Sequence, residues 1–223
     1  MPPTEDSKAP SSERPGPCDG EQIRKALVRQ WKRIAEAVPQ IDLDHASRLD
    51  GWRNREVLAH LYVQPFMLSR FLKSASHQEP STQLLENLSS TKSFSELIDA
   101  SAREGAKRGK YNFGVALEAT LPDLLDAHLD RTVTTLQGSI SLVDYLVTRC
   151  IEAVIHGGDL VPPVDPDRQA EAIAADALKE LLAIRSAHLL PEAERLSTAD
   201  WIAVATGRHT AIGNLASVVP VMH

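Results

Sequence analysis

Apolar residues recur at helical spacing along most of the chain that follows residue 19. Between Asp19 and Pro39 they stand three or four positions apart, with several Arg and Lys residues between them. This spacing places apolar side chains on one face of a helix. The pattern therefore predicts a first amphipathic helix whose buried face consists of Ile23, Leu27, Trp31, Ile34 and Val38.

A second helix is predicted after a polar connection formed by residues 40–51. Pro65 interrupts this helix. A proline inside a helix removes one backbone hydrogen bond and clashes with the carbonyl group four residues earlier, here that of Leu61. We therefore expect a kink close to His60. The apolar face of this helix consists of Trp52, Val57, Leu58, Leu61, Leu68, Phe71 and Leu72.

The region between the second helix and residue 138 carries weaker signals. Residues 93–96 have the spacing of a capping box and predict the start of a third helix, whose far end the pattern does not define. Pro122 favours a restart or a kink within residues 120–129. The β-branched run at 132–138 ends in glycine and indicates a loop or a short strand.

Residues 141–144 repeat the capping-box spacing and open the helix that carries Glu152 and His156. Gly157 and Gly158 should stop that helix. Asp165 and Pro166 then supply a cap and a first-turn proline for another helix. Its apolar stripe should consist of Ile173, Ala177, Leu181 and Ile184, and a last element runs from Ser197 to Gly207.

Four principal helices with few strand candidates predict an all-α fold, an antiparallel four-helix bundle with a short C-terminal helical extension. We expect residues 19–162 to form the bundle and residues 163–223 the extension. Residues 1–18 are rich in Pro, Ser and charge, and we expect a disordered tail there.

Composition argues against several classes of protein. The 30 acidic residues outnumber the 24 basic ones, and the basic residues are scattered, which argues against a nucleic-acid partner. With Cys18 and Cys150 alone, neither a disulfide framework nor a four-cysteine zinc site can form, and a reducing cytoplasm is the expected compartment. We interpret Cys150 as a core residue. No segment has the pattern of a signal peptide or a membrane span.

Glu152 and His156 stand four residues apart on one predicted helix, so their side chains lie on one face, one turn apart. His60 lies on another predicted helix, which a compact fold can bring beside them. Two imidazoles and one carboxylate form a three-ligand metal site that leaves a position open for water or a substrate thiol. The alternative is a buried polar cluster whose members bond to one another.

Three stretches of the sequence resemble a known family: residues 51–61, 149–160 and 201–208. They are similar to the mycothiol-dependent maleylpyruvate isomerase family of the DinB-like superfamily, and the likeness extends from about residue 20 to the end of the chain. The resemblance implies that His60, Glu152 and His156 ligate a divalent metal, usually zinc, within a four-helix bundle.

The resemblance also implies mycothiol as a cofactor and a small acidic or electrophilic substrate. A metal lowers the pKa of a bound thiol, so a thiolate is available at neutral pH without a protein cysteine. The implied reaction is cis–trans isomerisation of the maleylpyruvate type or thiol transfer. The alternative is a non-catalytic DinB-like metal-binding protein, a sensor or a partner-binding module. The sequence leaves the oligomeric state open.

The chain departs from the family at two places. Gly157 and Gly158 stand where family members commonly carry a large residue, often Trp, which predicts a wider pocket wall. Residues 166–223 leave room for two helices and a tail, where the full family has a small α/β domain. This segment resembles a truncated form of that domain.

Three further residues are candidates for the site. Asp159 either orients a ligand imidazole or caps the end of its helix. Arg149 either holds a substrate carboxylate at the mouth of the site or forms a surface ion pair. Arg208 either binds an anionic group of the thiol or the substrate, or pairs with acidic residues of the protein surface.

Overall fold

The computed structural model describes residues 19–90, 94–109, 112–211 and 213–222. The tail expected at residues 1–18 lies outside this part of the chain. Helices account for most of the described residues, and a short two-stranded hairpin accompanies them. The prediction of a mainly α-helical fold is confirmed. Among the described residues no helix is both long enough and apolar enough to cross a membrane.

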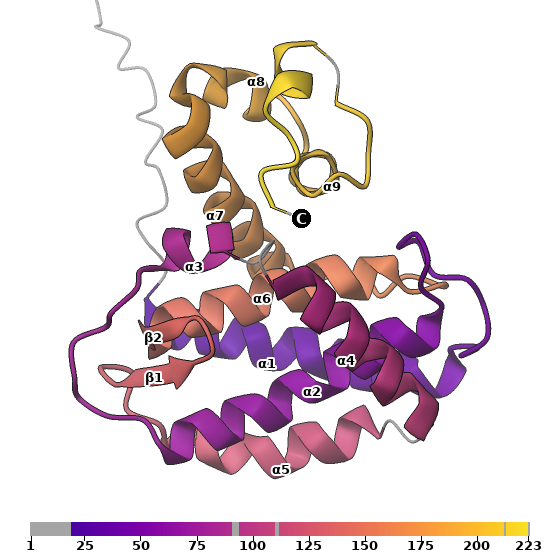
Figure 1. The fold of residues 1–223 in the computed structure, drawn as a ribbon, viewed down its shortest axis with the longest axis vertical. Coiled ribbons are helices and arrows are strands. Elements are labelled where there is room, and N and C mark those ends of the chain that lie inside the picture. Colours follow the sequence, from indigo (N-terminus) through magenta and orange to yellow (C-terminus); the bar gives the residue numbers. More distant parts are fainter. Residues whose placement is uncertain (1–18, 91–93, 110–111, 212, 223) are drawn as a thin grey trace, which may run out of the picture.

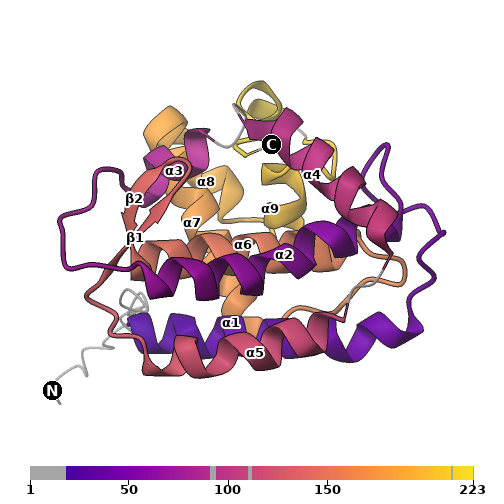
Figure 2. The ribbon, with the colours of Figure 1, turned by 60° about the horizontal axis from the view of Figure 1, so that its bottom comes forward.

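Four long helices form a bundle: α1 (Gly20–Ala37), α2 (Asn54–Lys73), α5 (Phe113–Asp126) and α6 (Leu142–Asp159). Helices α1 and α5 lie in one layer and α2 and α6 in the other (Figures 1 and 2). Each helix turns an apolar face inward, and burial of these faces stabilises the bundle. The predicted four-helix bundle is therefore confirmed. Its centre contains the buried side chains of Leu27, Ile34, Leu58, Leu61, Leu124 and Leu146.

Two helices of the bundle run in each direction. Arg24, near the start of α1, donates a hydrogen bond of 2.8 Å to the carbonyl of Leu124, near the end of α5, so these two helices are antiparallel. Lys73 ends α2 and lies 3.7 Å from the carboxylate of Asp123, near the end of α5, so α2 and α5 are parallel. This arrangement is possible because a long connection returns the chain between α2 and α5.

That connection contains α3 (Leu84–Ser90) and α4 (Ser95–Arg108), and the connection between α5 and α6 contains β1 (Thr132–Thr135) and β2 (Gly138–Ser141). Helix α4 is the predicted third helix, although its expected cap, Ser93, lies outside the described residues. The two strands pair in antiparallel register. Of the two alternatives predicted for residues 132–138, a loop or a short strand, the structure has the strand, β1.

Pro65 and Pro122 each lie inside a continuous helix. Helix α2 runs through Pro65, and α5 runs through Pro122 to Asp126. Of the restart or kink expected within residues 120–129, the structure contradicts the restart. Leu117 and Leu124 are buried on either side of the proline and hold one helix against the bundle. Their packing compensates for the hydrogen bond that the proline cannot make.

Helix α6 begins as predicted, with the Ser141 side chain accepting a hydrogen bond from the backbone of Asp144. It does not stop at Gly157 and Gly158 but continues to Asp159. Tertiary contact explains this difference at Gly157, where an added Cβ would lie 3.3 Å from Nε2 of Gln30 on α1. The glycine thus permits a close approach of two helices and does not end one.

The C-terminal extension contains α7 (Arg168–Ser186), α8 (Leu190–Ala193) and α9 (Thr198–Ala205). Helix α7 packs against α6, and α9 packs against α7 (Figure 2). The indole Nε1 of Trp201 donates a buried hydrogen bond of 3.0 Å to the carbonyl of Ala175. Helix α9 is the last element expected at residues 197–207.

Two details predicted for α7 are wrong. The cap is Asp167 and not Asp165, because the Asp167 carboxylate is the group that reaches the free backbone N–H groups of Gln169 and Ala170. Ile184 is 67% exposed and does not extend the buried stripe. The reason is positional, since the last turns of α7 project beyond the bundle (Figure 1).

Asp167 links the extension to the bundle. Its carboxylate accepts hydrogen bonds of 2.7 and 3.1 Å from Arg29 on α1, and its backbone N–H donates to Gln30 at 2.7 Å. Burial raises the pKa of Asp167, but the hydrogen bonds from Arg29 and from the α7 backbone outweigh burial and hold the pKa below its ordinary value. The stabilisation is therefore present above the ordinary carboxyl pKa and is lost as the pH falls through the lowered pKa.

Replacing Asp167 with Ala should lower the free energy of unfolding by about 1–3 kcal/mol, because the helix cap and the contact with Arg29 are lost together. Urea denaturation measures the change. The matched control is Asp165→Ala, at an exposed position two residues earlier, which should have little effect. Equal stability of the two variants would contradict the role of Asp167 as the cap.

Candidate metal centre

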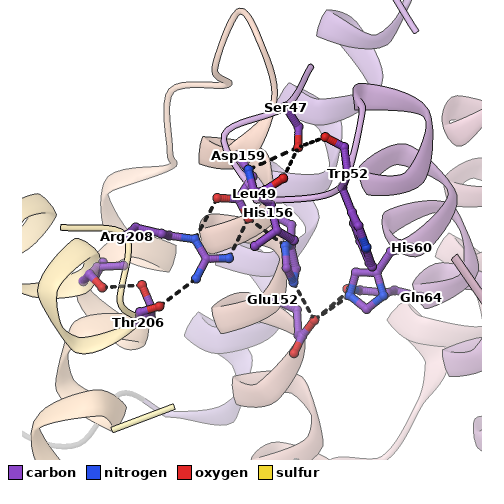
Figure 3. A network of polar contacts seen from close by, with 11 residues as sticks. Ser47, Leu49, Trp52, His60, Gln64, Glu152, His156, Asp159, Thr206 and Arg208 are labelled. Atoms are coloured by element: carbon purple, nitrogen blue, oxygen red, sulfur yellow. Dashed lines mark hydrogen bonds and ion pairs between the residues drawn. The ribbon is translucent and has the colours of Figure 1, made fainter. Parts of the chain in front are cut away.

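The structure brings His60, Glu152 and His156 together between α2 and α6 (Figure 3). One potential ligand atom from each lies within 4.8 Å of the other two. Nε2 of His60 is 2.7 Å from Oε2 of Glu152, and Nε2 of His156 is 3.5 Å from the same oxygen. The three side chains are only 13–16% exposed, so the cluster is largely buried but keeps some contact with solvent.

Trp52 covers one side of the cluster. Its ring stacks against His156 at a centroid distance of 6.4 Å and lies 6.0 Å from the ring of His60. The indole Nε1 donates a hydrogen bond of 2.7 Å to Asp99 on α4. These contacts fix the position of the Trp52 ring beside the cluster. Its burial agrees with the prediction that it belongs to an apolar face.

Asp159 and Arg208 extend the network behind His156 (Figure 3). Oδ2 of Asp159 is 2.9 Å from Nδ1 of His156. Nε and Nη2 of Arg208 donate hydrogen bonds of 2.7 and 2.6 Å to the two carboxylate oxygens of Asp159. The side chain of Asp159 is 2% exposed. Its contact with the imidazole is the geometry of a group that orients a ligand histidine.

Charge explains why this network is stable. Burial raises the pKa of Asp159, but the hydrogen bonds from Arg208 and His156 outweigh burial and bring that pKa to about 2. Asp159 therefore stays ionised, and its Oδ2 accepts a hydrogen bond from the N–H at Nδ1 of His156. With Nδ1 protonated, the remaining lone pair of a neutral His156 lies on Nε2, which faces Glu152.

The three clustered groups affect one another strongly. Burial lowers the pKa of His60 and outweighs the hydrogen bond with Glu152, which raises that pKa. The charges of His156 and Arg149 lower it further. Burial raises the pKa of Glu152, but hydrogen bonds from both histidines hold that pKa well below its ordinary value. The carboxylates of Glu152 and Asp159 carry two negative charges against one on Arg208. The cluster therefore favours one further positive charge, either a proton on His156 or a metal cation.

Sequence reasoning missed Gln64, which lies one turn after His60 on the same face of α2. Its Nε2 is 3.3 Å from Nε2 of His60 and 3.5 Å from Oε2 of Glu152. The sequence signal was that Gln64 stands four residues after His60, which places both on one face of the helix. This spacing alone does not distinguish a residue of the site from a packing residue.

Arg149 lies outside the ligand cluster. Its guanidinium stacks over the ring of Tyr145 at 5.0 Å, and its Nε donates to the hydroxyl of Thr148 at 3.2 Å. In the described part of the chain no carboxylate lies within 4.0 Å of it. Cys150 is fully buried, with its sulfur 3.9 Å from the carbonyl of Ile23, so the prediction of a core residue agrees with its position.

A hollow of about 220 Å³ opens in the C-terminal extension, lined by residues between Val204 and Pro220. None of the clustered ligand residues lines it. Gly158, next to the cluster, has open space where a side chain would stand. The space beside Gly158 is compatible with the wider pocket wall that the glycine pair predicts.

Comparison with known proteins gives a family match. The family model described as the mycothiol maleylpyruvate isomerase N-terminal domain matches residues 24–161, which include His60, Glu152 and His156. A solved structure, the crystal structure of the mycothiol-dependent maleylpyruvate isomerase, is similar with a TM-score of 0.47 and 15% sequence identity. The alignment covers 74% of this chain and 70% of that chain. No curated protein matches.

The ion pair between Arg208 and Asp159 should be important for stability. Arg208→Ala should lower the free energy of unfolding by about 3 kcal/mol, because it leaves a buried carboxylate without its main cation. Chemical denaturation of the single variants and of the Asp159→Asn, Arg208→Ala double variant measures the coupling. The decrease in the free energy of unfolding should be smaller in the double variant than the sum of the decreases in the two single variants. The control, exposed Arg195→Ala, should be close to neutral, and additive losses would contradict the coupling.

Proposed function

The chain belongs to the family of the mycothiol maleylpyruvate isomerase N-terminal domain, and from that premise we propose that it is a metal-dependent enzyme that uses mycothiol. His60, Glu152 and His156 hold a divalent cation, which we propose to be zinc. The bundle of residues 19–162 supplies these ligands, and the extension of residues 163–223 supplies Arg208. The substrate is a small acidic or electrophilic molecule.

The observation that carries this proposal is the fit of the donor set. Nitrogen and oxygen ligands of tetrahedral zinc lie about 2.0–2.1 Å from the ion and hence roughly 3.4 Å from one another. The 3.5 Å between Nε2 of His156 and Oε2 of Glu152 is close to that value. The 2.7 Å between Nε2 of His60 and the same oxygen is a hydrogen bond, which would have to lengthen when a cation binds. Two imidazoles and one carboxylate are also the ligand types of catalytic zinc sites, which keep a position open.

A divalent cation bound here lowers the pKa of a thiol, so that a thiolate is available at neutral pH. We propose that the thiol comes from outside the protein. Among the described residues the one cysteine, Cys150, is buried toward Ile23 and is not one of the clustered groups. Asp159 holds the proton on Nδ1 of His156 and thereby leaves Nε2 as the ligand atom. Trp52 shields the two imidazoles from water.

Arg149 is the residue that we propose for the substrate carboxylate. Its guanidinium is near enough to influence the pKa of His60, and the structure describes no acidic partner for it. For Arg208 the two bonds to Asp159 favour a supporting role over direct contact with an anion. We therefore assign substrate binding to Arg149 and orientation of the Asp159 carboxylate to Arg208.

The reaction is an isomerisation of the maleylpyruvate type or a thiol transfer. In isomerisation, the thiolate sulfur adds to a conjugated carbon–carbon double bond, which becomes a single bond and can rotate. Elimination then breaks the carbon–sulfur bond and restores both the double bond and the thiolate. In transfer, the adduct takes up a proton instead, and the new carbon–sulfur bond is kept. The low exposure of the three ligands, 13–16%, also suits a DinB-like metal-binding protein without catalysis, which is the second candidate.

Substituting His60, Glu152 or His156 with Ala should in each case abolish stoichiometric metal binding while the helical content remains. The bundle core is formed by other side chains, so the fold does not require the three ligands. Elemental analysis and circular dichroism measure the two properties. The control is His77→Ala, whose side chain is 70% exposed on the protein surface. A full equivalent of metal in the His156→Ala protein would exclude the proposed ligand set.

Mycothiol should bind the metal-loaded protein with release of a proton near neutral pH, and should bind the chelator-treated protein much more weakly. Calorimetry in buffers of different ionisation enthalpy detects the proton. Equal affinity for both forms, or no binding to either, would favour the non-catalytic candidate.

A further inference from the structure

Gln64 is a buried polar residue beside the proposed metal ligands. The residue is 1% exposed and lies on the face of α2 that carries His60. Its side chain points toward His60 and Glu152 (Figure 3). A buried amide in a bundle core normally has hydrogen-bond partners for both its nitrogen and its oxygen, because an unpaired polar atom is costly to bury.

Among the described residues, Gln64 has hydrogen-bond partners for its amide nitrogen but none for its amide oxygen. Nε2 lies 3.5 Å from Oε2 of Glu152 and 3.3 Å from Nε2 of His60. Oε1 is buried, and no donor among the described residues lies within hydrogen-bond distance of it. The amide thus adjoins two proposed ligand atoms and has an acceptor oxygen that the described protein does not use.

Gln30 shows what a purely structural buried glutamine does in the same bundle. It is fully buried, its Nε2 donates to the carbonyl of Ala153 at 3.3 Å, and its Oε1 accepts from the backbone of Asp167 at 2.7 Å. Both ends of that amide connect elements of the fold. Gln64 differs because its amide is directed at the ligand cluster.

We propose that Gln64 is a fourth polar group of the centre, whose amide binds the exchangeable group, water or thiol, beside the metal. This inference rests on the proposed function. An amide suits both occupants, since Oε1 accepts a hydrogen bond from water and, after rotation of the side chain, Nε2 donates one to a thiolate. Gln64 then holds the incoming sulfur without adding a charge that would repel it.

The experiment uses the full-length protein loaded with Co²⁺, whose visible absorption reports the groups around the metal, followed by titration with mycothiol. Gln64→Leu should still bind Co²⁺, but with an altered visible spectrum and about 10-fold weaker binding of mycothiol. Gln64→Glu should bind Co²⁺ more tightly and mycothiol more weakly, because its carboxylate attracts the cation and repels the thiolate.

The matched control is Gln30→Leu, which also removes a buried amide from the bundle. It should lower the melting temperature and leave the Co²⁺ spectrum and the mycothiol affinity unchanged. If Gln64→Leu behaves in the same way, Gln64 is a packing residue and the inference is overturned, while Co²⁺ binding by the wild type preserves the proposed function. If Gln64→Leu does not fold, an unchanged spectrum and unchanged mycothiol affinity in Gln64→Glu overturn it.

Failure of the proposed function gives a different result. Wild-type protein that binds no Co²⁺ would overturn the metal centre and this inference together. Wild-type protein that binds Co²⁺ but no mycothiol would overturn the thiol chemistry of the proposed function. An altered Co²⁺ spectrum in Gln64→Leu would then still support contact of Gln64 with water at the metal, and an unchanged spectrum would overturn the inference.

Discussion

Glu152 places a carboxylate between two helices of the bundle, where an uncompensated charge would be costly. His60 approaches it from α2 and His156 from one turn further along α6. Because these partners come from facing helices, compensation of this charge joins α2 and α6 at the centre, while apolar packing holds the helices in place. A centre that favours added positive charge follows from this constraint, and the proposed divalent cation supplies it with one charge in excess.

A buried carboxylate also needs compensation at the contact between the bundle and the C-terminal extension. Asp159 is a second buried carboxylate behind His156, and Arg208 compensates it through two hydrogen bonds. The extension therefore contacts the centre through this guanidinium. The orientation of His156 and the docking of the extension are thus linked by one ion pair.

Much of the fold and part of the candidate site followed from local rules. The helical period identified α1, α2, α6 and α7, and the hydroxyl of Ser141 caps α6 at the predicted residue. The spacing of Glu152 and His156 placed both on one helical face, since four residues make about one turn. His60 was selected by resemblance together with its helical context. These features depend on neighbours close in sequence, which a single sequence displays.

What the sequence determined by itself was the helical composition, the bundle class and three residues suited to a metal. The tertiary structure alone decided that Gly157 permits a helix contact, that Arg208 reaches Asp159, and that the amide of Gln64 adjoins the cluster. Each of these depends on atoms brought together from separate elements or on the direction that a side chain takes inside the packed core. Periodicity along one chain specifies which face a residue occupies, but only packing specifies what that face meets.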